Sequence, residues 1–226
     1  MDYSKSDIER IINQVEFEYQ QVNLPYGLMI QGRDRSTTSN VIFPNSLEGK
    51  KVLDIGCALG YFCYQAEIKG AEKVVGLENK TSRFQQALLI KDILQSNVEF
   101  HQLDIYDYDT DIKFDYVLLL NVLHHLTKPM EALQKIADFT KHKLIIEFPT
   151  FYDKRFRRFL PDELHKLLND LPLIGVSSLK DKHFDQTFIF GPNALERILI
   201  DHLSAFNSIR FVDSPIEGRM IAFCDK

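Results

Sequence analysis

The sequence contains few cysteines, and none of them forms a CxxC pair. The three, Cys57, Cys63 and Cys224, are an odd number in a chain of 226 residues. Such a set argues against a framework of disulfide bonds. We therefore expect the protein in a reducing compartment, the cytoplasm.

Long hydrophobic runs and an excess of positive charge are also missing. No apolar run approaches the roughly 20 residues that cross a bilayer. The first ten residues, MDYSKSDIER, are polar and do not resemble a secretory signal. The formal net charge is −5 and there is no basic tail. We therefore expect no membrane partner, and nucleic acid is an unfavoured partner, although this balance leaves room for a local basic patch.

The pattern that is present alternates short apolar runs with helical periodicity, beginning at Lys51. The runs predict strands over 51–55, 73–77, 98–103, 114–120 and 143–147, with helices over 61–68, 81–94 and 129–139. Repeated units of this kind predict a doubly wound, mostly parallel sheet with helices on both faces. Near the end, a helix capped by Asn193 and Glu196 and running to about Ala205 precedes strands over 209–212 and 219–223. Their short connection makes them an antiparallel hairpin, so the expected fold is α/β with seven strands.

Two segments lie outside this alternation. The first is an N-terminal part, 1–46, with an amphipathic helix over 6–20, capped by Ser6 and Glu9, and irregular structure over 22–46. Its polar stretch 31–35 (QGRDR) is either a lid or a solvated linker. The second is an insertion at about 148–192 within the main domain 47–226, which includes a predicted helix over 161–170.

One glycine-bearing stretch, KVLDIGCALGYF at 51–62, reads as strand, tight turn and helix. This geometry lets the backbone approach a nucleotide-like ligand closely. Asp54 precedes the turn, while Glu78 and Asp104 end the next two strands. In doubly wound sheets, a carboxylate there can bind a ribose or an exocyclic amine. A dinucleotide-dependent dehydrogenase is disfavoured, because two glycines of its G-x-G-x-x-G pattern are absent.

The runs VLDIGCALG, VVGLEN, FHQLDI and FDYVLLLNVLHHL together resemble the class I S-adenosylmethionine-dependent methyltransferases over residues 48–147. One departure is Ala58, where that family often has a further glycine. The resemblance implies S-adenosylmethionine as cofactor, with Glu78 on the ribose and Asp104 on the adenine side. The implied cofactor-binding residues are Asp54, Gly56, Cys57, Gly60, Glu78, Asn79, Asp104, Ile105 and Asn121. A looser similarity links the chain to methyltransferases acting on tRNA wobble uridine or on bacterial carbohydrates.

Residues that follow the fourth and fifth strands are candidates for the acceptor side. His124 or His125 can act as a general base, position the acceptor or play a structural role. We expect no metal, because adjacent histidines bind one ion poorly. Glu147 either orients substrate or is a surface acid. Tyr152 and Arg155, in the aromatic and basic run FYDKRFRRF, either bind substrate or form the surface of a helix.

These observations favour a methyltransferase that modifies an oxygen atom of a small molecule or sugar. A tRNA methyltransferase is the alternative enzyme. A third hypothesis is a methyltransferase-like subunit that binds a partner without catalysis. The sequence leaves the oligomeric state open, and a homodimer is compatible with it.

Overall fold

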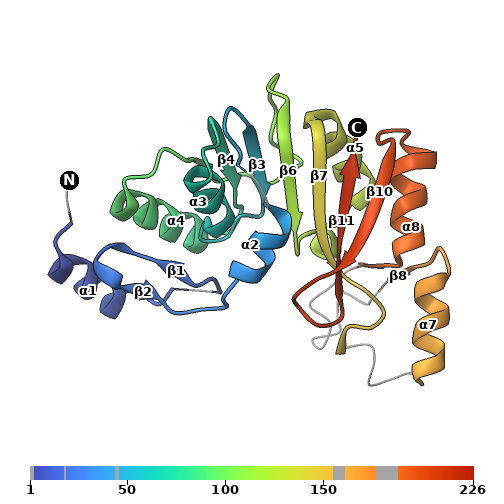
Figure 1. Cartoon of the computed structure of the whole chain (residues 1–226), viewed down its shortest axis with the longest axis horizontal. Helices are drawn as coiled ribbons and strands as arrows, with labels where there is room; N and C mark the ends of the chain where they lie inside the picture. The colour runs from blue at the N-terminus through green and yellow to red at the C-terminus, as the bar shows by residue number, and fades with distance from the viewer. Residues whose placement is uncertain (1–2, 18, 44–45, 155–160, 177–187) are drawn as a thin grey trace. The chain divides into compact units, whose positions relative to one another are not determined.

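The computed structural model describes residues 3–17, 19–43, 46–154, 161–176 and 188–226 (Figure 1). The chain divides into two compact units, residues 1–109 and 110–226. A seven-stranded sheet has the order β10-β11-β7-β6-β3-β4-β5, and two further sheets have two strands each. The expected α/β class and the seven strands are confirmed.

The first unit contains three parallel strands, β3 (Lys51–Ile55), β4 (Lys73–Leu77) and β5 (Glu99–His101). Helix α3 (Tyr61–Ile68) packs on β3 and β4, and α4 (Thr81–Leu94) contacts β5. β3, β4 and both helices have the predicted bounds, whereas β5 is shorter than the predicted 98–103. The N-cap residue of α4 is Lys80.

The N-terminal segment is more ordered than the sequence indicated. Its elements are α1 (Lys5–Gln14), β1 (Val22–Asn23), the 3₁₀ turn η1 (Pro25–Gly27), β2 (Met29–Ile30) and α2 (Ser36–Ile42). The predicted Ser6–Glu9 cap was wrong, because Ser4 and Asp7 form the capping box of α1. The expectation of irregular structure over 22–46 was wrong as well. Its order comes from pairing between β1 and β2, which local periodicity does not reveal.

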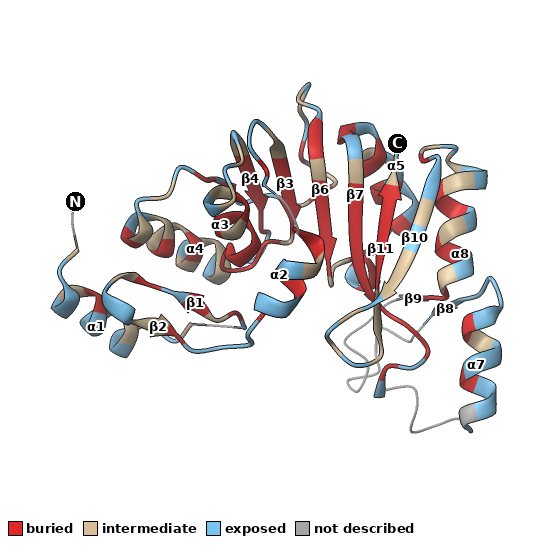
Figure 2. Cartoon of the chain, viewed as in Figure 1, coloured by how far each residue is buried: buried red, intermediate tan, exposed pale blue. Residues whose placement is uncertain are grey.

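The second unit is built on β6 (Phe114–Leu120) and β7 (Thr140–Pro149), which are parallel. β11 (Arg219–Asp225) pairs antiparallel with β7, and β10 (Ser208–Asp213) pairs antiparallel with β11. The predicted C-terminal hairpin is therefore confirmed. β6 is buried along most of its length, as Figure 2 shows, which explains its nearly continuous apolar sequence.

The remaining elements of this unit are η2 (Leu123–His125), α5 (Pro129–Phe139), α7 (Asp162–Asp170), β8 (Ile174–Val176), β9 (Phe188–Phe190), α8 (Pro192–Arg197) and the π-helix η3 (Ile198–His202). The predicted Asn193–Glu196 cap was wrong. Gly191 is the N-cap residue of α8, and the Asn193 side-chain amide donates to the Asp170 carbonyl. Of the helices that the structure describes, none combines the length and apolar character needed to cross a bilayer.

Gly60 gives a direct test of the turn between β3 and α3. Its φ is +85°, and a Cβ atom there would lie 2.5 Å from Cζ of Phe100, whose buried ring packs edge-on against Tyr64. We expect Gly60→Ala to lower the free energy of unfolding by about 3 kcal/mol, through backbone strain plus this collision. Gly49→Ala is the matched control, since φ is +67° there but the space is open. It should cost about 1 kcal/mol. Equal losses in urea denaturation would contradict the collision.

Candidate cofactor and acceptor sites

The loop after β3 is tied to the end of β4 by its own backbone. The amides of Gly56 and Cys57 donate to the Leu77 carbonyl at 2.8 and 2.9 Å. Gly56, Ala58 and Gly60 all have positive φ, of 70°, 53° and 85°. The left-handed conformation of Ala58 explains why glycine suits this position, and the chain adopts it with alanine nonetheless.

Glu78 directly follows β4 and binds the same loop. Its side chain is buried, with Oε2 accepting from the Ala58 amide and Oε1 from the Lys80 amide, both at 2.9 Å. A carboxylate has about four acceptor sites. These two bonds therefore leave Glu78 the capacity to accept hydroxyl groups of a ligand.

Asn79 and Asp104 link the ends of β4 and β5. The Asn79 side-chain amide donates to Oδ2 of Asp104 at 3.0 Å, and the Tyr106 amide donates to Oδ1 at 3.3 Å. Asp104 is partly exposed, whereas neighbouring Ile105 is buried. The structure thus brings the three predicted strand-end acids, Asp54, Glu78 and Asp104, into one unit with the glycine loop.

Asp54 is buried beside two cysteines. The Sγ atom of Cys63 donates to its Oδ2 at 3.5 Å. Burial raises the pKa of Asp54 to about 7; the Cys63 hydrogen bond and the positive charge of Arg35 act in the opposite direction, while the negative charge of Glu78 raises it further. Burial also raises the pKa of the Cys57 thiol, whose Sγ lies near Gly76 in the core. This environment gives Cys57 no character of a nucleophile.

Sequence reasoning missed four buried polar residues in the described part of the N-terminal segment, Gln20, Arg35, Thr38 and Ser39. Gln20 accepts hydrogen bonds from the amides of the glycine loop, and the Arg35 guanidinium lies 5.2 Å from the ring centroid of Phe62. The polar stretch 31–35 was the available signal. What it lacked was any indication that Arg35 faces inward while its neighbours are exposed.

In the second unit, a buried carboxylate organises the ends of β6 and β7. Glu147 accepts a hydrogen bond from the Asn121 side-chain amide through Oε2, and one from the Ser214 hydroxyl through Oε1 at 2.6 Å. The backbone amide of Asn121 also donates to the backbone carbonyl of Glu147 at 2.8 Å, and Asn121 has a φ of +63°. Since Glu147 has no exposed surface, it would act on a substrate through Asn121.

The two histidines occupy the 3₁₀ turn η2 rather than extended backbone. His124 is buried and His125 is exposed, with their ring centroids 4.1 Å apart. Strands β7 and β9 contact this turn. No group of three or more histidine, cysteine, aspartate or glutamate side chains in the described ranges is arranged to hold a metal ion.

Of the two candidate residues from the insertion, the structure describes Tyr152 but not Arg155. Tyr152 is 42% exposed, and its ring lies 6.3 Å from that of His165 on α7. The buried His165 Nδ1 is 2.8 Å from the Phe151 carbonyl, which connects α7 to this turn. Arg155 lies outside the described residues, so its proposed role in binding substrate stays a prediction.

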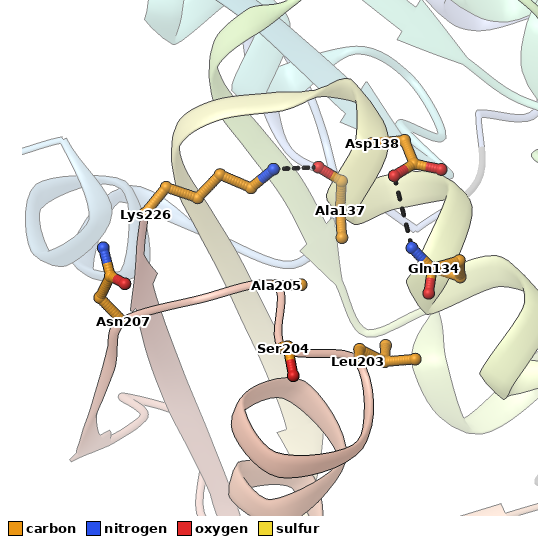
Figure 3. Close-up of a pocket in the computed structure, with 8 residues that line it drawn as sticks. All are labelled: Gln134, Ala137, Asp138, Leu203, Ser204, Ala205, Asn207 and Lys226. Atoms are coloured by element: carbon orange, nitrogen blue, oxygen red, sulfur yellow. Dashed lines mark hydrogen bonds between the residues drawn. The ribbon is translucent and has the colours of Figure 1, made fainter.

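The second unit also contains a polar pocket of about 350 Å³ (Figure 3). Its lining consists of Gln134, Ala137, Asp138, Leu203, Ser204, Ala205, Asn207 and Lys226. Lys226 Nζ donates to the Ala137 carbonyl at 2.7 Å. Because Lys143 pairs with Asp225 and Glu147 with Ile221, Lys226 lies at the opposite end of β7 from Glu147. The pocket is therefore separate from the Asn121–Glu147 cluster.

Comparison with known proteins gives this geometry a class. A family model described as a methyltransferase domain matches residues 46–186, which is more than half of the chain. The chain belongs to this family, and its fold is that of the class I S-adenosylmethionine-dependent methyltransferases. S-adenosylmethionine is the cofactor of that class.

Relatives agree on the fold but differ in what they act on. The chain is 35% identical over 91 residues to a tRNA U34 carboxymethyltransferase from Campylobacter hominis, covering 40% of this chain and 32% of that protein. It spans between about a third and a half of the length of the curated relatives it matches. The crystallised N-terminal domain of EvdMO1 with S-adenosylhomocysteine has a TM-score of 0.69 at 14% identity, covering 99% and 96% of the two chains. The same domain was also crystallised in the presence of S-adenosylhomocysteine and D-fucose, with a TM-score of 0.67 at 15% identity and the same coverage. Magnesium protoporphyrin IX methyltransferase from Synechocystis, with S-adenosylhomocysteine, has a TM-score of 0.59 at 19% identity, covering 85% and 81%.

The side chains of the first unit fit this cofactor chemically. A ribose presents two hydroxyl donors and an adenine presents an amine donor, and carboxylates are acceptors for both. Glu78 is held by two backbone amides and retains acceptor capacity, while Asp104 is partly exposed. Glu78, Asp104 and the positive-φ loop would hold the nucleoside and the methionine portion.

Glu78 gives a test of cofactor binding that does not require the acceptor. We expect Glu78→Gln to weaken S-adenosylhomocysteine binding about 100-fold, since a charge-assisted bidentate acceptor is lost. Calorimetry measures the affinity. Glu99→Gln is the matched control, because Glu99 is an exposed acid on β5 that pairs with Lys73. Unchanged affinity in Glu78→Gln would contradict the ribose assignment.

Asp54 predicts a particular pH dependence of stability. Its folded-state pKa of about 7 lies above the value of about 3.9 expected in the unfolded chain. The folded state therefore binds more protons between these values, so its contribution is greatest at low pH and declines as pH rises to about 7. From pH 5 to pH 8 we expect wild type to lose about 3 kcal/mol relative to Asp54→Asn in urea denaturation. Parallel pH profiles for the two proteins would refute this origin.

Proposed function

We propose that this protein transfers a methyl group from S-adenosylmethionine to an oxygen atom of a small hydroxylated molecule, such as a sugar. The observation that carries the choice of oxygen is the exposed imidazole of His125, in the 3₁₀ turn η2 that follows β6. A hydroxyl acceptor must lose its proton as it is methylated, and histidine titrates in the physiological range. The match over nearly all of both chains to a domain crystallised in the presence of S-adenosylhomocysteine and D-fucose supports an acceptor of this size.

The chain's own residues have separate roles in this reaction. S-adenosylmethionine supplies, when bound, an activated methyl group on a positively charged sulfur. Glu78 and Asp104 accept hydrogen bonds from the nucleoside and so orient it. Glu147 and Ser214 fix Asn121, which keeps the end of β6 in one conformation. His125 accepts the proton of the acceptor hydroxyl. Orientation is expected to account for most of the rate enhancement, because the transfer is an in-line displacement.

The proposal predicts the effect of replacing the base. With the acceptor found by screening hydroxylated metabolites with tritiated S-adenosylmethionine, we expect His125→Asn to lower kcat by 10²–10⁴. Its affinity for S-adenosylhomocysteine should stay unchanged. His202→Asn is the matched control, an exposed histidine on η3 in the same unit. Full turnover by His125→Asn would remove the base assignment, and a product methylated on carbon or nitrogen would remove the choice of oxygen.

A tRNA acceptor is the second candidate, and two observations favour it. The curated relatives are named tRNA U34 carboxymethyltransferases. In addition, the Tyr19 ring, 38% exposed, has two guanidinium groups near it, with Arg33 at 5.9 Å and Arg83 at 5.6 Å from its centroid. Aromatic and arginine side chains together suit unstacked bases and phosphates.

Measurement of binding to unmodified tRNA distinguishes a tRNA acceptor from a small-molecule acceptor. Salt-dependent binding that Arg33→Glu and Arg83→Glu abolish, with tritium transferred to the RNA, would replace the small-molecule proposal. Binding of S-adenosylhomocysteine without transfer to any acceptor would instead favour a non-catalytic subunit.

A further inference from the structure

Residues 19–21 and 31–33 of the N-terminal segment form a short ribbon. This ribbon lies against the glycine loop after β3. Gln20 forms a parallel bridge with Arg33, and the Gln21 amide donates to the Arg33 carbonyl at 3.1 Å. The Arg33 amide donates to the Tyr19 carbonyl at 2.8 Å. The ribbon thus contains part of the polar stretch 31–35 that the sequence left open as lid or linker, and it has a defined place in the first unit.

Gln20 directs its side chain to the start of α3. Its Oε1 atom accepts from the amides of Leu59 and Tyr61 at 3.0 and 3.3 Å, and the residue is only 3% exposed. The N-cap residue of α3 is Gly60, which has no side chain to cap the helix. A buried amide without a partner is costly, so Gln20 provides the acceptor that the local sequence lacks.

The position of Gln20 depends on a close approach of the two backbones. A Cβ atom on Gly32 would lie 2.5 Å from the carbonyl carbon of Gln20 and 2.7 Å from the amide nitrogen of Gln21. Both contacts are to backbone, which cannot rotate away as a side chain can. Only glycine at position 32 lets the ribbon hold Gln20 at this place.

Two consecutive backbone amides of the loop therefore each donate to a side-chain acceptor. One acceptor comes from a residue after the loop in the sequence, and the other comes from a residue before it. Glu78 accepts from Ala58, and Gln20 accepts from Leu59. We propose that Gln20 is a positioning residue for the cofactor, which holds the second half of the glycine loop in its binding conformation. This inference rests on the proposed function. A loop ordered before binding loses less entropy when the ligand arrives, which raises affinity.

The central test compares Gln20→Met, which removes the acceptor at similar size, with Gln20→Glu, which keeps it. A carboxylate at the N-terminus of α3 is also favoured by the helix dipole. We expect Gln20→Met to bind S-adenosylhomocysteine about 10-fold more weakly by calorimetry, and Gln20→Glu to remain within about threefold of wild type. Hydrogen exchange without ligand should accelerate at the Leu59 and Tyr61 amides in Gln20→Met but not in Gln20→Glu.

A second pair of variants leaves Gln20 in place. Gly32→Ala forces the ribbon apart and should weaken binding in the same direction as Gln20→Met, with faster exchange at the same two amides. Gly27→Asn is its control, because Gly27 has φ +71° with open space around it and asparagine tolerates this conformation. Gly27→Asn should bind like wild type.

The outcomes separate the inference from the proposed function. If wild type does not bind S-adenosylhomocysteine, both fail. If wild type binds and Gln20→Met binds equally well, or Gln20→Glu loses as much affinity as Gln20→Met, the positioning role is overturned while the proposed function stands. Should Gln20→Met not fold, Gly32→Ala with normal affinity and normal exchange at the two amides would overturn it in the same way.

Discussion

The hydrogen bond from the Ala58 amide to the Glu78 carboxylate is the interaction on which the first unit depends. It joins the loop after β3 to the end of β4, so the glycine turn and the strand-end acid form one structure rather than two neighbouring features. Leu77 adds to the connection, because its carbonyl accepts from two loop amides. A loop of small residues at positive φ would otherwise have many conformations, and these bonds select one.

Holding charged groups in this place has an electrostatic cost that shows in Asp54. Burial raises the pKa of this carboxyl group and the negative charge of Glu78 raises it further, whereas the Cys63 thiol donor and the positive charge of Arg35 act in the opposite direction. Strained backbone and displaced pKa values often gather at functional sites, because the surrounding fold maintains what local chemistry disfavours. The first unit has both at one turn. The second unit uses a related device, since the buried Glu147 has its oxygens bonded to Asn121 and Ser214.

The names of the similar proteins agree on the methyltransferase class but not on the acceptor. Similarity to the tRNA U34 carboxymethyltransferases extends over less than half of their length, while solved structures of the same fold carry different names. A shared cofactor explains this pattern, because the binding of one nucleoside constrains a few strand ends and one loop. Acceptor recognition has no such common requirement, and function is decided by the side chains added to the fold.

The sequence by itself determined the alternation of strands and helices, the glycine turn, and the acids in the loops that follow β4 and β5. These features are local: each is a period of hydrophobicity, a turn residue or a position at the end of a run. Only the tertiary structure decided that Gln20 caps α3, that Arg35 is buried near Asp54, and that Glu147 faces Asn121 rather than solvent. Each of these contacts joins residues about 20 or more positions apart, and no local pattern encodes which distant partner a polar side chain will meet.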